Sequence, residues 1–535
     1  MVKKFLLLGL CVSFLVASTS SALFAQTTKQ YYANGVLQSE GKFNKAGMED
    51  STWKFYYDNG NLQELSEYKN GIFEGKVFRY YRSGKIQVEG YFKYGVEDSL
   101  QRAFYENGNK QREGRYDLGK KVGKWANFKE SGDTLSVYSF DEDPERIVSY
   151  YDDKGKKTIS KGNGFMEIFN DLGILISRQE FANGIPHGKF YTYYGSGAIE
   201  VEGEYVNGIK NGTWLEKFSD GKIQKSTTYN QGKVTGPYEE YFDNGKLYVK
   251  GTFTDGLKTG TWHWYRPNGN QDIDGHFVDD KQDGNWTFYH DNNVWQSKGE
   301  FKDGLMQGKW EYQYPSAKKW KEGTFVDNNK EGVWTNWYEN GKTLQQGTYK
   351  AGKEEGLWKS YYENGQLKDV GEFKAGKMNG KWTGYGPKGQ VLYSGEWLNE
   401  MKIGTWVNFD EKGTIRSVNT FDKKGIQNGT QKLYNQTGNL ISSGKYKNGK
   451  REGKWEYRYD FGALLRTCTY KNGVLEGKSK MYSENGTLFE DANYKNNRYN
   501  GECTFFDPKT GKLLEKGIYE NGKMIKLLEG GPTKR

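Results

Sequence analysis

The chain has 535 residues, among them 41 tyrosines, 29 phenylalanines and 16 tryptophans, and its formal net charge is +10. This charge is small for the length, and Lys and Glu are interleaved along the chain, so no track for phosphates is indicated and we expect no nucleic-acid partner. The three cysteines are too few for a disulfide framework.

Residues 1–25 have the composition of a secretory signal peptide. Two lysines near the start are followed by an apolar run from Phe5 to Ala17 and then by small residues up to Ala25. The apolar run is too short for a membrane span. We therefore expect cleavage after Ala25 and an exported protein, located in the periplasm, on the outer surface or outside the cell.

Beyond the signal peptide, glycine recurs about every 24 residues, which predicts an array of about twenty repeats. Asn293 and Ala317 take two of the positions in this series. The glycines of the series are Gly35, Gly60, Gly84, Gly108, Gly132, Gly197, Gly221, Gly245, Gly269, Gly341, Gly365, Gly389, Gly413, Gly438, Gly462, Gly486 and Gly511.

Each repeat is expected to form a β-hairpin, because short runs rich in Tyr, Trp, Thr and Val are bounded by Asn-Gly, Asp-Gly or Ser-Gly. The residue before the series glycine varies, so only the glycine needs a positive φ. This favours a type I turn closed by a glycine bulge over a type I′ turn. Asn293 suits such a position, whereas the turn at Ala317 should be strained or different.

Tryptophan recurs 17 residues after the series glycine, and a further glycine recurs at offset 6. A hairpin places these two offsets opposite each other, so we expect each offset-6 glycine to receive the indole ring of the neighbouring strand. Ten tryptophans follow this spacing: Trp125 and Trp455 toward the ends and, between them, a candidate binding or packing stripe of Trp214, Trp262, Trp286, Trp310, Trp334, Trp358, Trp382 and Trp406.

The predicted fold class is all-β, an elongated, twisted, antiparallel hairpin array forming a single solenoid-like sheet. The glycine spacing shortens between residues 133 and 173, where tryptophan is missing and Pro144 follows an acidic run. The expected organisation is a signal peptide (1–25), an N-terminal array (26–132), an irregular or degenerate stretch (133–173), a C-terminal array (174–524) and a polar tail (525–535).

The consensus Tyr-x-Asn-Gly-x-Leu-x-x-x-Gly-x-Tyr-x-x-Gly-x-x-x-Gly-x-Trp resembles the bacterial variant of the MORN repeat. The segments from Tyr338 to Trp358 and from Tyr362 to Trp382 carry it most fully. The resemblance covers nearly all of residues 30–522. It implies scaffolding, protein binding or contact with membrane lipids, and some members are antitoxins that bind a toxin protein.

No pattern in the sequence indicates catalysis, so we expect no catalytic residues, no metal site and no cofactor. The four histidines lie in different repeats without ligand-like spacing. No glycine precedes a Lys-Ser or Lys-Thr pair at the head of a helix, as a phosphate loop would require. Carboxylates recur in the turns throughout the array, so no catalytic pair can be singled out.

Two functions remain: a non-catalytic scaffold that binds a protein through an extended sheet surface, and a module that binds carbohydrate or a cell-envelope polymer. The second rests on a resemblance to choline- and glucan-binding hairpin repeats, whose aromatic rings hold quaternary ammonium groups or sugars. A membrane surface is kept as a further partner. The aromatics outside the regular position, which are better candidates for exposed contacts, are Trp264, Trp295, Trp320 and Trp397.

Overall fold

The computed structural model describes residues 27–531, so the predicted signal peptide lies outside the described residues. Within this range every regular element is a β-strand, and 44 strands are formed. No helix in residues 27–531 is long and apolar enough to cross a membrane. The chain divides into an N-terminal unit (residues 1–245 and 253–256) and a C-terminal unit (246–252 and 257–535).

The strands of the N-terminal unit are mostly eight or nine residues long. They are β1 (Thr28–Tyr31), β2 (Leu37–Phe43), β3 (Glu49–Tyr56), β4 (Leu62–Lys69), β5 (Ile72–Tyr80), β6 (Ile86–Lys93), β7 (Val96–Phe104), β8 (Lys110–Asp117), β9 (Lys120–Phe128), β10 (Thr134–Ser139), β11 (Arg146–Tyr151), β12 (Lys157–Ser160), β13 (Asn163–Phe169), β14 (Leu175–Ala182), β15 (Ile185–Tyr193), β16 (Ile199–Val206), β17 (Ile209–Lys217), β18 (Ile223–Asn230) and β19 (Lys233–Tyr241).

The next strand, β20 (Leu247–Thr254), has residues in both units. The C-terminal unit continues with β21 (Leu257–Tyr265), β22 (Gln271–Val278), β23 (Lys281–Gln282), β24 (Gly284–Tyr289), β25 (Trp295–Lys302), β26 (Leu305–Gln313), β27 (Lys319–Val326), β28 (Asn329–Trp337), β29 (Thr343–Lys350), β30 (Lys353–Tyr361), β31 (Leu367–Lys374), β32 (Lys377–Tyr385), β33 (Val391–Leu398), β34 (Met401–Phe409), β35 (Ile415–Phe421), β36 (Gln427–Tyr434), β37 (Leu440–Lys447), β38 (Lys450–Arg458), β39 (Leu464–Lys471), β40 (Val474–Tyr482), β41 (Leu488–Lys495), β42 (Arg498–Phe506), β43 (Leu513–Glu520) and β44 (Lys523–Gly530).

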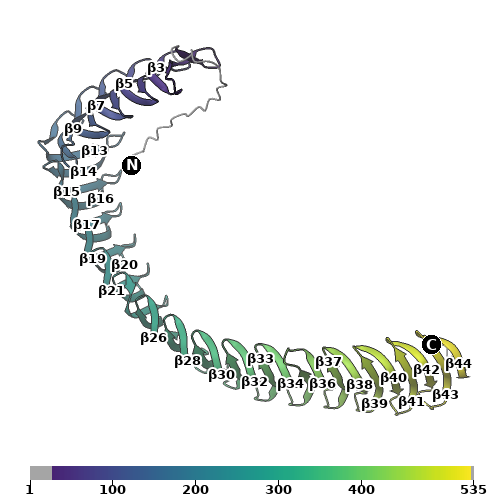
Figure 1. Cartoon of the computed structure of the whole chain (residues 1–535). Helices are drawn as coiled ribbons and strands as arrows, with labels where there is room; N and C mark the ends of the chain where they lie inside the picture. The colour runs from purple at the N-terminus through teal and green to yellow at the C-terminus, as the bar shows by residue number, and fades with distance from the viewer. Residues whose placement is uncertain (1–26, 532–535) are drawn as a thin grey trace. The chain divides into compact units, whose positions relative to one another are not determined.

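In each unit, consecutive strands pair antiparallel, except that β23 and β24 both pair with β22. Strands β32, β33 and β34, for example, lie side by side (Figure 1). Among residues 27–531 no strand pairing closes either unit into a barrel, so each is an open sheet built from successive hairpins. The predicted all-β class and antiparallel hairpin array are therefore confirmed. Each strand depends on its sequence neighbours for burial, as in repeat proteins generally.

Several strands are shorter than the regular length, among them β1, β23 and β24, which have 4, 2 and 6 residues. Residues 133–173 contain β10 to β13, which have 6, 6, 4 and 7 residues. The last strand, β44, runs to Gly530 and so includes the first residues of the segment expected to be a polar tail.

The turn at the series glycines is a type I turn with a glycine bulge, as predicted, except at Gly511, whose N–H donates one residue further back, to the Asp507 carbonyl. In one repeat the Gly341 N–H donates to the Tyr338 carbonyl at 2.9 Å, and the Tyr338 N–H donates to the Lys342 carbonyl at 2.8 Å. Gly341 has a φ of 88°. Ala317 makes the same turn, with a φ of 64°, so the turn there is strained rather than different in its hydrogen bonds.

The second turn of most repeats joins the two strands of the hairpin through two residues, whereas residues 44–48 and 422–426 form longer connections. Between β29 and β30 these are Ala351 and Gly352, with φ values of 48° and 77°. Two consecutive positive values are the requirement of a type I′ turn, whose twist matches that of the flanking strands. The array therefore alternates two turn types along its opposite edges.

Glycine and tryptophan form the packing unit of the sheet. A Cβ atom at Gly347 would lie 2.0 Å from the indole ring of Trp358, so only glycine fits beneath the ring. This confirms the predicted pairing of offset 6 with offset 17. The same relation holds, at 2.0 to 2.5 Å, for Gly41–Trp53, Gly114–Trp125, Gly203–Trp214, Gly251–Trp262, Gly275–Trp286, Gly299–Trp310, Gly323–Trp334, Gly371–Trp382, Gly395–Trp406 and Gly444–Trp455.

Side chains in the two rows of turns connect successive repeats. At the series turn, the Tyr338 hydroxyl donates to the Tyr361 carbonyl at 2.8 Å and the Asn340 amide donates to the Glu363 carbonyl at 3.0 Å. At the other edge, a Glu331 carboxylate oxygen accepts the Ala351 N–H at 2.8 Å. The Tyr-x-Asn-Gly motif and many of the recurring carboxylates are thus explained by contacts between repeats.

Candidate binding surfaces

The sheet has two faces, which we name by their side chains. The tryptophan face carries the offset-17 rings, and the polar face carries the residues that alternate with them along the strands. On the tryptophan face Trp334 packs edge-on against Phe325 at a centroid distance of 5.0 Å and against Tyr349 at 6.2 Å. Such edge-to-face contacts between aromatic rings are favourable beyond the area they bury.

The predicted stripe from Trp214 to Trp406 lies on this face. Each of its eight rings is at most 9% exposed: Trp214, Trp262, Trp286, Trp310, Trp334, Trp358, Trp382 and Trp406. Trp53 belongs to the same set although its spacing from Gly35 is 18, because one extra residue in the loop before β3 shifts it. Rings buried to this degree serve packing and present little area to a ligand.

Basic side chains cover part of the tryptophan row. The ammonium group of Lys330 lies 4.6 Å from the ring centroids of both Trp334 and Tyr349. Burial lowers the pKa of Lys330 below its usual value. Cation–π attraction holds such an ammonium group over the rings. In the sequence, this contact corresponds to a lysine four residues before the tryptophan. The same contact recurs at Lys210, Lys258 and Lys402.

The four aromatics outside the regular position occupy different environments. Trp320 is 37% exposed, whereas Trp264, Trp295 and Trp397 are half-buried. Trp264 stacks near both Trp262 and Trp286, at 5.8 and 6.0 Å. Trp320 alone of these four therefore offers an open ring.

Trp320 belongs to a small aromatic group at the surface. Its ring centroid lies 6.1 Å from that of Tyr312 and 6.0 Å from that of Tyr314. The Lys321 ammonium group is 4.3 Å from the centroids of both Tyr312 and Trp320. Burial raises the pKa of Tyr312 to about 12.

On the polar face of the C-terminal unit one row of residues runs without a gap from β21 to β44. Register partners link it from His263 and Asp274 through Thr335, Gln346, Lys359, Val370 and Thr383 to Lys516 and Glu529. Its members up to Lys516 are largely half-buried. The row therefore presents a side chain at every strand, at about 4.8 Å intervals.

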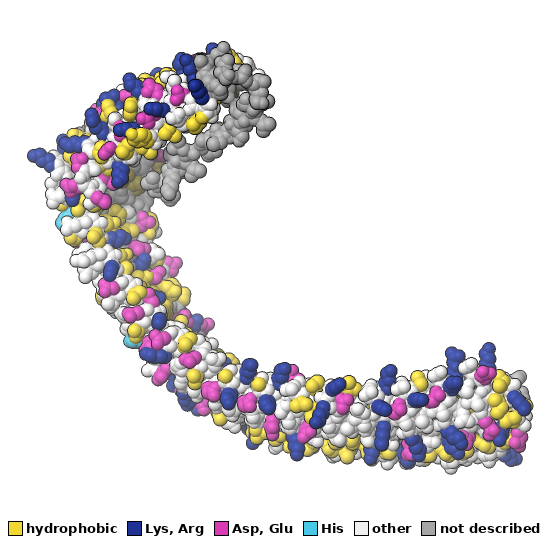
Figure 2. Space-filling model, in the orientation of Figure 1, with side chains coloured by type: hydrophobic (Ala, Val, Ile, Leu, Met, Phe, Trp, Pro, Cys, Tyr) yellow, Lys and Arg dark blue, Asp and Glu magenta, His cyan; other side chains and the backbone are white. Residues whose placement is uncertain are grey.

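Charges in this row are largely paired within the sheet. His263 Nδ1 lies 2.7 Å from an Asp274 carboxylate oxygen, and the Lys298 ammonium group lies 3.3 Å from Glu311. Basic and acidic side chains also intermingle on the face seen in Figure 2. The polar face consequently has no extended field of one sign.

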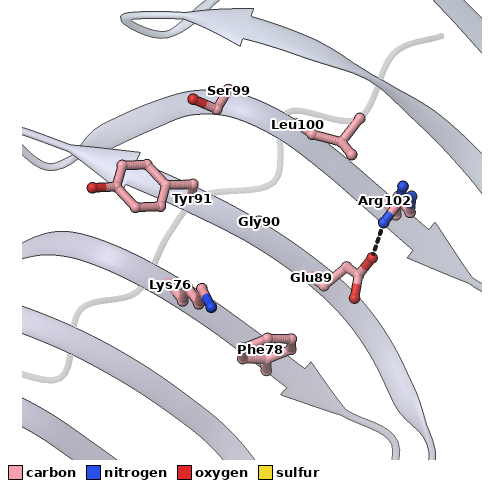
Figure 3. A pocket seen from close by; sticks show the side chains of 8 residues that line it. All are labelled: Lys76, Phe78, Glu89, Gly90, Tyr91, Ser99, Leu100 and Arg102. Carbon is pink, nitrogen blue, oxygen red and sulfur yellow. Dashed lines mark hydrogen bonds and ion pairs between the residues drawn. The ribbon is translucent and has the colours of Figure 1, made fainter.

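In the N-terminal unit the polar face is hollowed between β5, β6 and β7 by a pocket of about 260 Å³ (Figure 3). Gly90 forms its floor, and the side chains of Phe78, Tyr91 and Leu100 supply apolar walls. Arg102 at one end donates to Glu89 at 2.7 Å and to Glu113 at 3.2 Å. The hydrogen bonds that it donates to these two carboxylates raise the pKa of the Arg102 guanidinium.

The residue types that could catalyse a reaction or bind a metal, His, Cys, Asp and Glu, are scattered over the described residues. In the part of the chain that the structure describes, no group of three or more His, Cys, Asp or Glu residues is placed to hold a metal ion. Cys468 on β39 and Cys503 on β42 are free thiols, buried and three strands apart. They occupy the offsets of a glycine and a tryptophan, so both serve packing.

The MORN repeat variant model matches ten segments: residues 27–45, 49–70, 73–94, 186–207, 234–255, 330–351, 354–375, 427–448, 451–472 and 475–496. These matches confirm the resemblance stated from the consensus. No curated protein matches the chain.

Among solved structures, the chain is similar to the crystal structure of TcdB2-TccC3-Cdc42, with 12% identity over 88% of this chain and 28% of that one and a TM-score of 0.13. For TcdB2-TccC3 the identity is 12%, the shares are 91% and 33%, and the TM-score is 0.14. For the Photorhabdus luminescens Tc holotoxin pore the identity is 12% over 94% of this chain and 30% of that one, and the TM-score is 0.14. The chain spans about a third or less of each of these proteins, so the repeat type is set by the family match alone.

Proposed function

We propose that this chain, which belongs to the MORN-repeat proteins, is an exported, non-catalytic scaffold that binds a protein partner on the polar face of its sheet. Export is proposed from the signal-like composition of residues 1–25. A partner of extended or repetitive form suits an array that offers equivalent positions every two strands, about 9 to 10 Å apart.

The observation that carries the proposal is the unequal use of the two faces. The offset-17 tryptophans of the stripe are at most 9% exposed and serve packing, while the polar face keeps an unbroken row of largely half-buried side chains over the C-terminal unit. Non-obligate protein interfaces are about as apolar as the rest of a protein surface, so a face of mixed polar, paired charged and small apolar side chains is compatible with one. The absence of a field of one sign favours a protein over a phosphate polymer.

The test uses Thr383→Arg, which places a large charged side chain in the middle of the row. Its matched control is Gln366→Arg, which adds the same charge at an exposed turn of the neighbouring hairpin. Retention of an envelope protein on the immobilised chain should fall at least about fivefold with Thr383→Arg, with unchanged melting temperature, and persist with Gln366→Arg. Equal retention by both variants would refute polar-face binding.

The alternative is binding of carbohydrate or an envelope polymer, and the aromatic group of the half-buried Tyr312 and Tyr314 with the exposed Trp320 favours it. Aromatic faces stack on sugar rings, and Trp320 is open to solvent. Binding of purified cell-wall polysaccharide that is lost with Trp320→Ala, but kept with Thr383→Arg, would support this function instead. A catalytic activity removed by one His, Asp or Glu substitution without loss of stability would contradict both.

A further inference from the structure

Two turn residues of the N-terminal unit differ from the others of their kind. Tyr94 and Leu118 occupy the first position of the two-residue turns after β6 and β8, with φ values of 53° and 44°. They are the bulky apolar residues among the described non-glycine residues with positive φ. Equivalent turns place a small or polar residue there, such as Asn70, Asn207 or Asn472.

These two residues are unfavourable for folding on two counts. The left-handed region disfavours bulky side chains and is tolerated best by asparagine, aspartate and glycine. In addition, the Tyr94 and Leu118 side chains are 67% and 52% exposed, so they bury little apolar surface in return. Strain kept in this way is a recurrent mark of functional positions.

The two residues extend a continuous apolar edge. Ile72 is 48% exposed and lies beside Gly95, the residue after Tyr94 in the turn. A Cβ atom added at Gly95 would be 3.8 Å from the Cβ atom of Ile72. Val96, 38% exposed, lies in the same way beside Gly119, at 3.5 Å. Ile72, Tyr94, Val96 and Leu118 therefore form one row, which we name the apolar turn edge. Contiguous exposed apolar surface marks a site of interaction.

The charges around this edge exclude an anionic membrane as the favoured partner. The side chains that flank the turns are Lys69, Lys93, Lys120, Glu74, Asp98 and Asp117. Glu74 and Asp98 accept the N–H groups of Tyr94 and Leu118, at 2.8 and 3.3 Å. Basic and acidic groups balance, whereas a membrane-binding surface carries an excess of Lys and Arg.

We propose that the apolar turn edge docks an amphipathic helix of a protein partner. Tyr94 and Leu118 occupy equivalent turns two strands apart, about 10 Å. A helix rises about 10.5 Å over seven residues, and its apolar side chains recur at i, i+3, i+4 and i+7. A helix lying along the direction of strand stacking thus meets one turn residue per two helical turns. The inference rests on the proposed protein-binding function and assigns it a second surface.

The experiment replaces Tyr94 by the photo-crosslinking residue p-benzoylphenylalanine in the full chain. The control carries the same residue in place of Asn472, the corresponding turn position of the C-terminal unit. After irradiation in the cell envelope of the producing organism, an adduct should form at position 94 at least about tenfold above position 472. It should be abolished by Leu118→Asn, and its mapped peptide should show apolar residues at helical spacing.

Stability provides the second readout. Tyr94→Asn and Leu118→Asn should leave the melting temperature unchanged or raise it, because asparagine tolerates the left-handed conformation. A lower melting temperature for both variants would assign the side chains to folding and overturn the proposal. A lipid adduct, equal adducts at both positions, or an adduct indifferent to Leu118→Asn would overturn it too. If any of these results were found, the proposed binding on the polar face would still hold, provided that Thr383→Arg still reduced retention of the envelope protein on the immobilised chain.

Discussion

Strands β28 to β34 and strands β4 to β8 are built on one repeat but fill their interiors in different ways. In the first region every offset-6 glycine lies beneath a tryptophan ring, as Gly347 lies beneath Trp358. In the second region Val77 stands where a tryptophan would be, and the residue facing it on the preceding strand is Ser66 instead of glycine. Both are at most 2% exposed. The volume lost when valine replaces the tryptophan ring is filled by the larger side chain, serine instead of glycine, on the facing strand.

This compensation recurs where tryptophan is missing in the C-terminal unit. Cys468 pairs with Ser479, and Ala492 pairs with Cys503. In each pair the side chain at the glycine position grows as the side chain at the tryptophan position shrinks. Close packing explains the coupling, because a void beneath a missing ring loses contacts on all sides. The two offsets therefore act as one site shared between strands.

Gly90 is an exception to this rule. It keeps the glycine, but its partner at the tryptophan position is Gln101, which is 7% exposed. A Cβ atom at Gly90 would lie 3.3 Å from the Gln101 side chain, compared with 2.0 Å from the ring at Gly347. The packing there is looser, and this site lies beside the pocket that Gly90, Phe78 and Leu100 line on the polar face.

Removing a ring should have the largest effect. We expect Trp334→Ala to destabilise the C-terminal unit by about 4 kcal/mol, because Trp334 is 3% exposed and no neighbouring side chain can fill its place above Gly323. The loss in free energy of unfolding is measured by denaturant unfolding, with hydrogen exchange of β27 to β29 as the local readout. Trp320→Ala is the control and should cost less than about 1 kcal/mol, since that ring is 37% exposed. Equal losses would refute the packing role assigned to the row.

Adding one methyl group beneath a ring should have the next largest effect. Gly347→Ala is expected to cost about 2 kcal/mol by overpacking against Trp358. Gly195→Ala serves as the control, because Gly195, like Gly347, has no positive φ, but nothing lies within 4 Å of a Cβ there. In the background of Trp358→Ala, the cost of Gly347→Ala should largely vanish. Additive free energies in this double-mutant cycle would show that the two sites are independent.

Filling the loose site should stabilise. Gln101→Trp is expected to add about 1 kcal/mol, since the facing residue is already Gly90 and a ring there buries apolar area. The same substitution at Val77 should destabilise, because Ser66 occupies the facing position. Thermal melting of the two variants compares them directly. Stabilisation in both, or in neither, would contradict the rule that the two offsets share one volume.

The sequence was sufficient to predict the features that repeat. The period, the hairpins, the turn at Gly341 and the placement of Trp358 over Gly347 all follow from recurrence at fixed offsets, which averages out local exceptions. Trp53 was missed because the loop before β3 shifts the count by one. The type I′ turns were missed because their first residue varies from Ala351 to Tyr94, although both have positive φ.

Features made by different repeats were beyond prediction from one sequence. The bond from Tyr338 to the Tyr361 carbonyl and the cover of Trp334 by Lys330 need the separation of neighbouring strands to be known. The pocket over Gly90 and the apolar turn edge at Tyr94 and Leu118 are departures from the consensus. A repeat pattern shows which residues pack, whereas one of its exceptions, the apolar turn edge, is where the second binding surface is proposed.

The smallest expected effect concerns backbone strain alone. Ala317 adopts the conformation that glycine takes in the other series turns, with a φ of 64° and the same hydrogen bonds. Replacing it by glycine removes a cost of about 1 to 2 kcal/mol. Glycine also has greater conformational freedom in the unfolded chain, and this effect offsets about 0.4 to 1 kcal/mol of the gain in stability. Ala317→Gly should therefore stabilise by about 0.5 to 1 kcal/mol in denaturant unfolding.

The reverse substitution provides the matched control. Gly341→Ala introduces a Cβ that would meet nothing within 4 Å, so only backbone strain and the freedom of the unfolded chain contribute, as for Ala317→Gly. It should destabilise by about the amount that Ala317→Gly gains, with the opposite sign. If Ala317→Gly destabilised instead, the turn before β27 would be held by contacts of the Ala317 methyl group, and the shared turn geometry would not account for its energy.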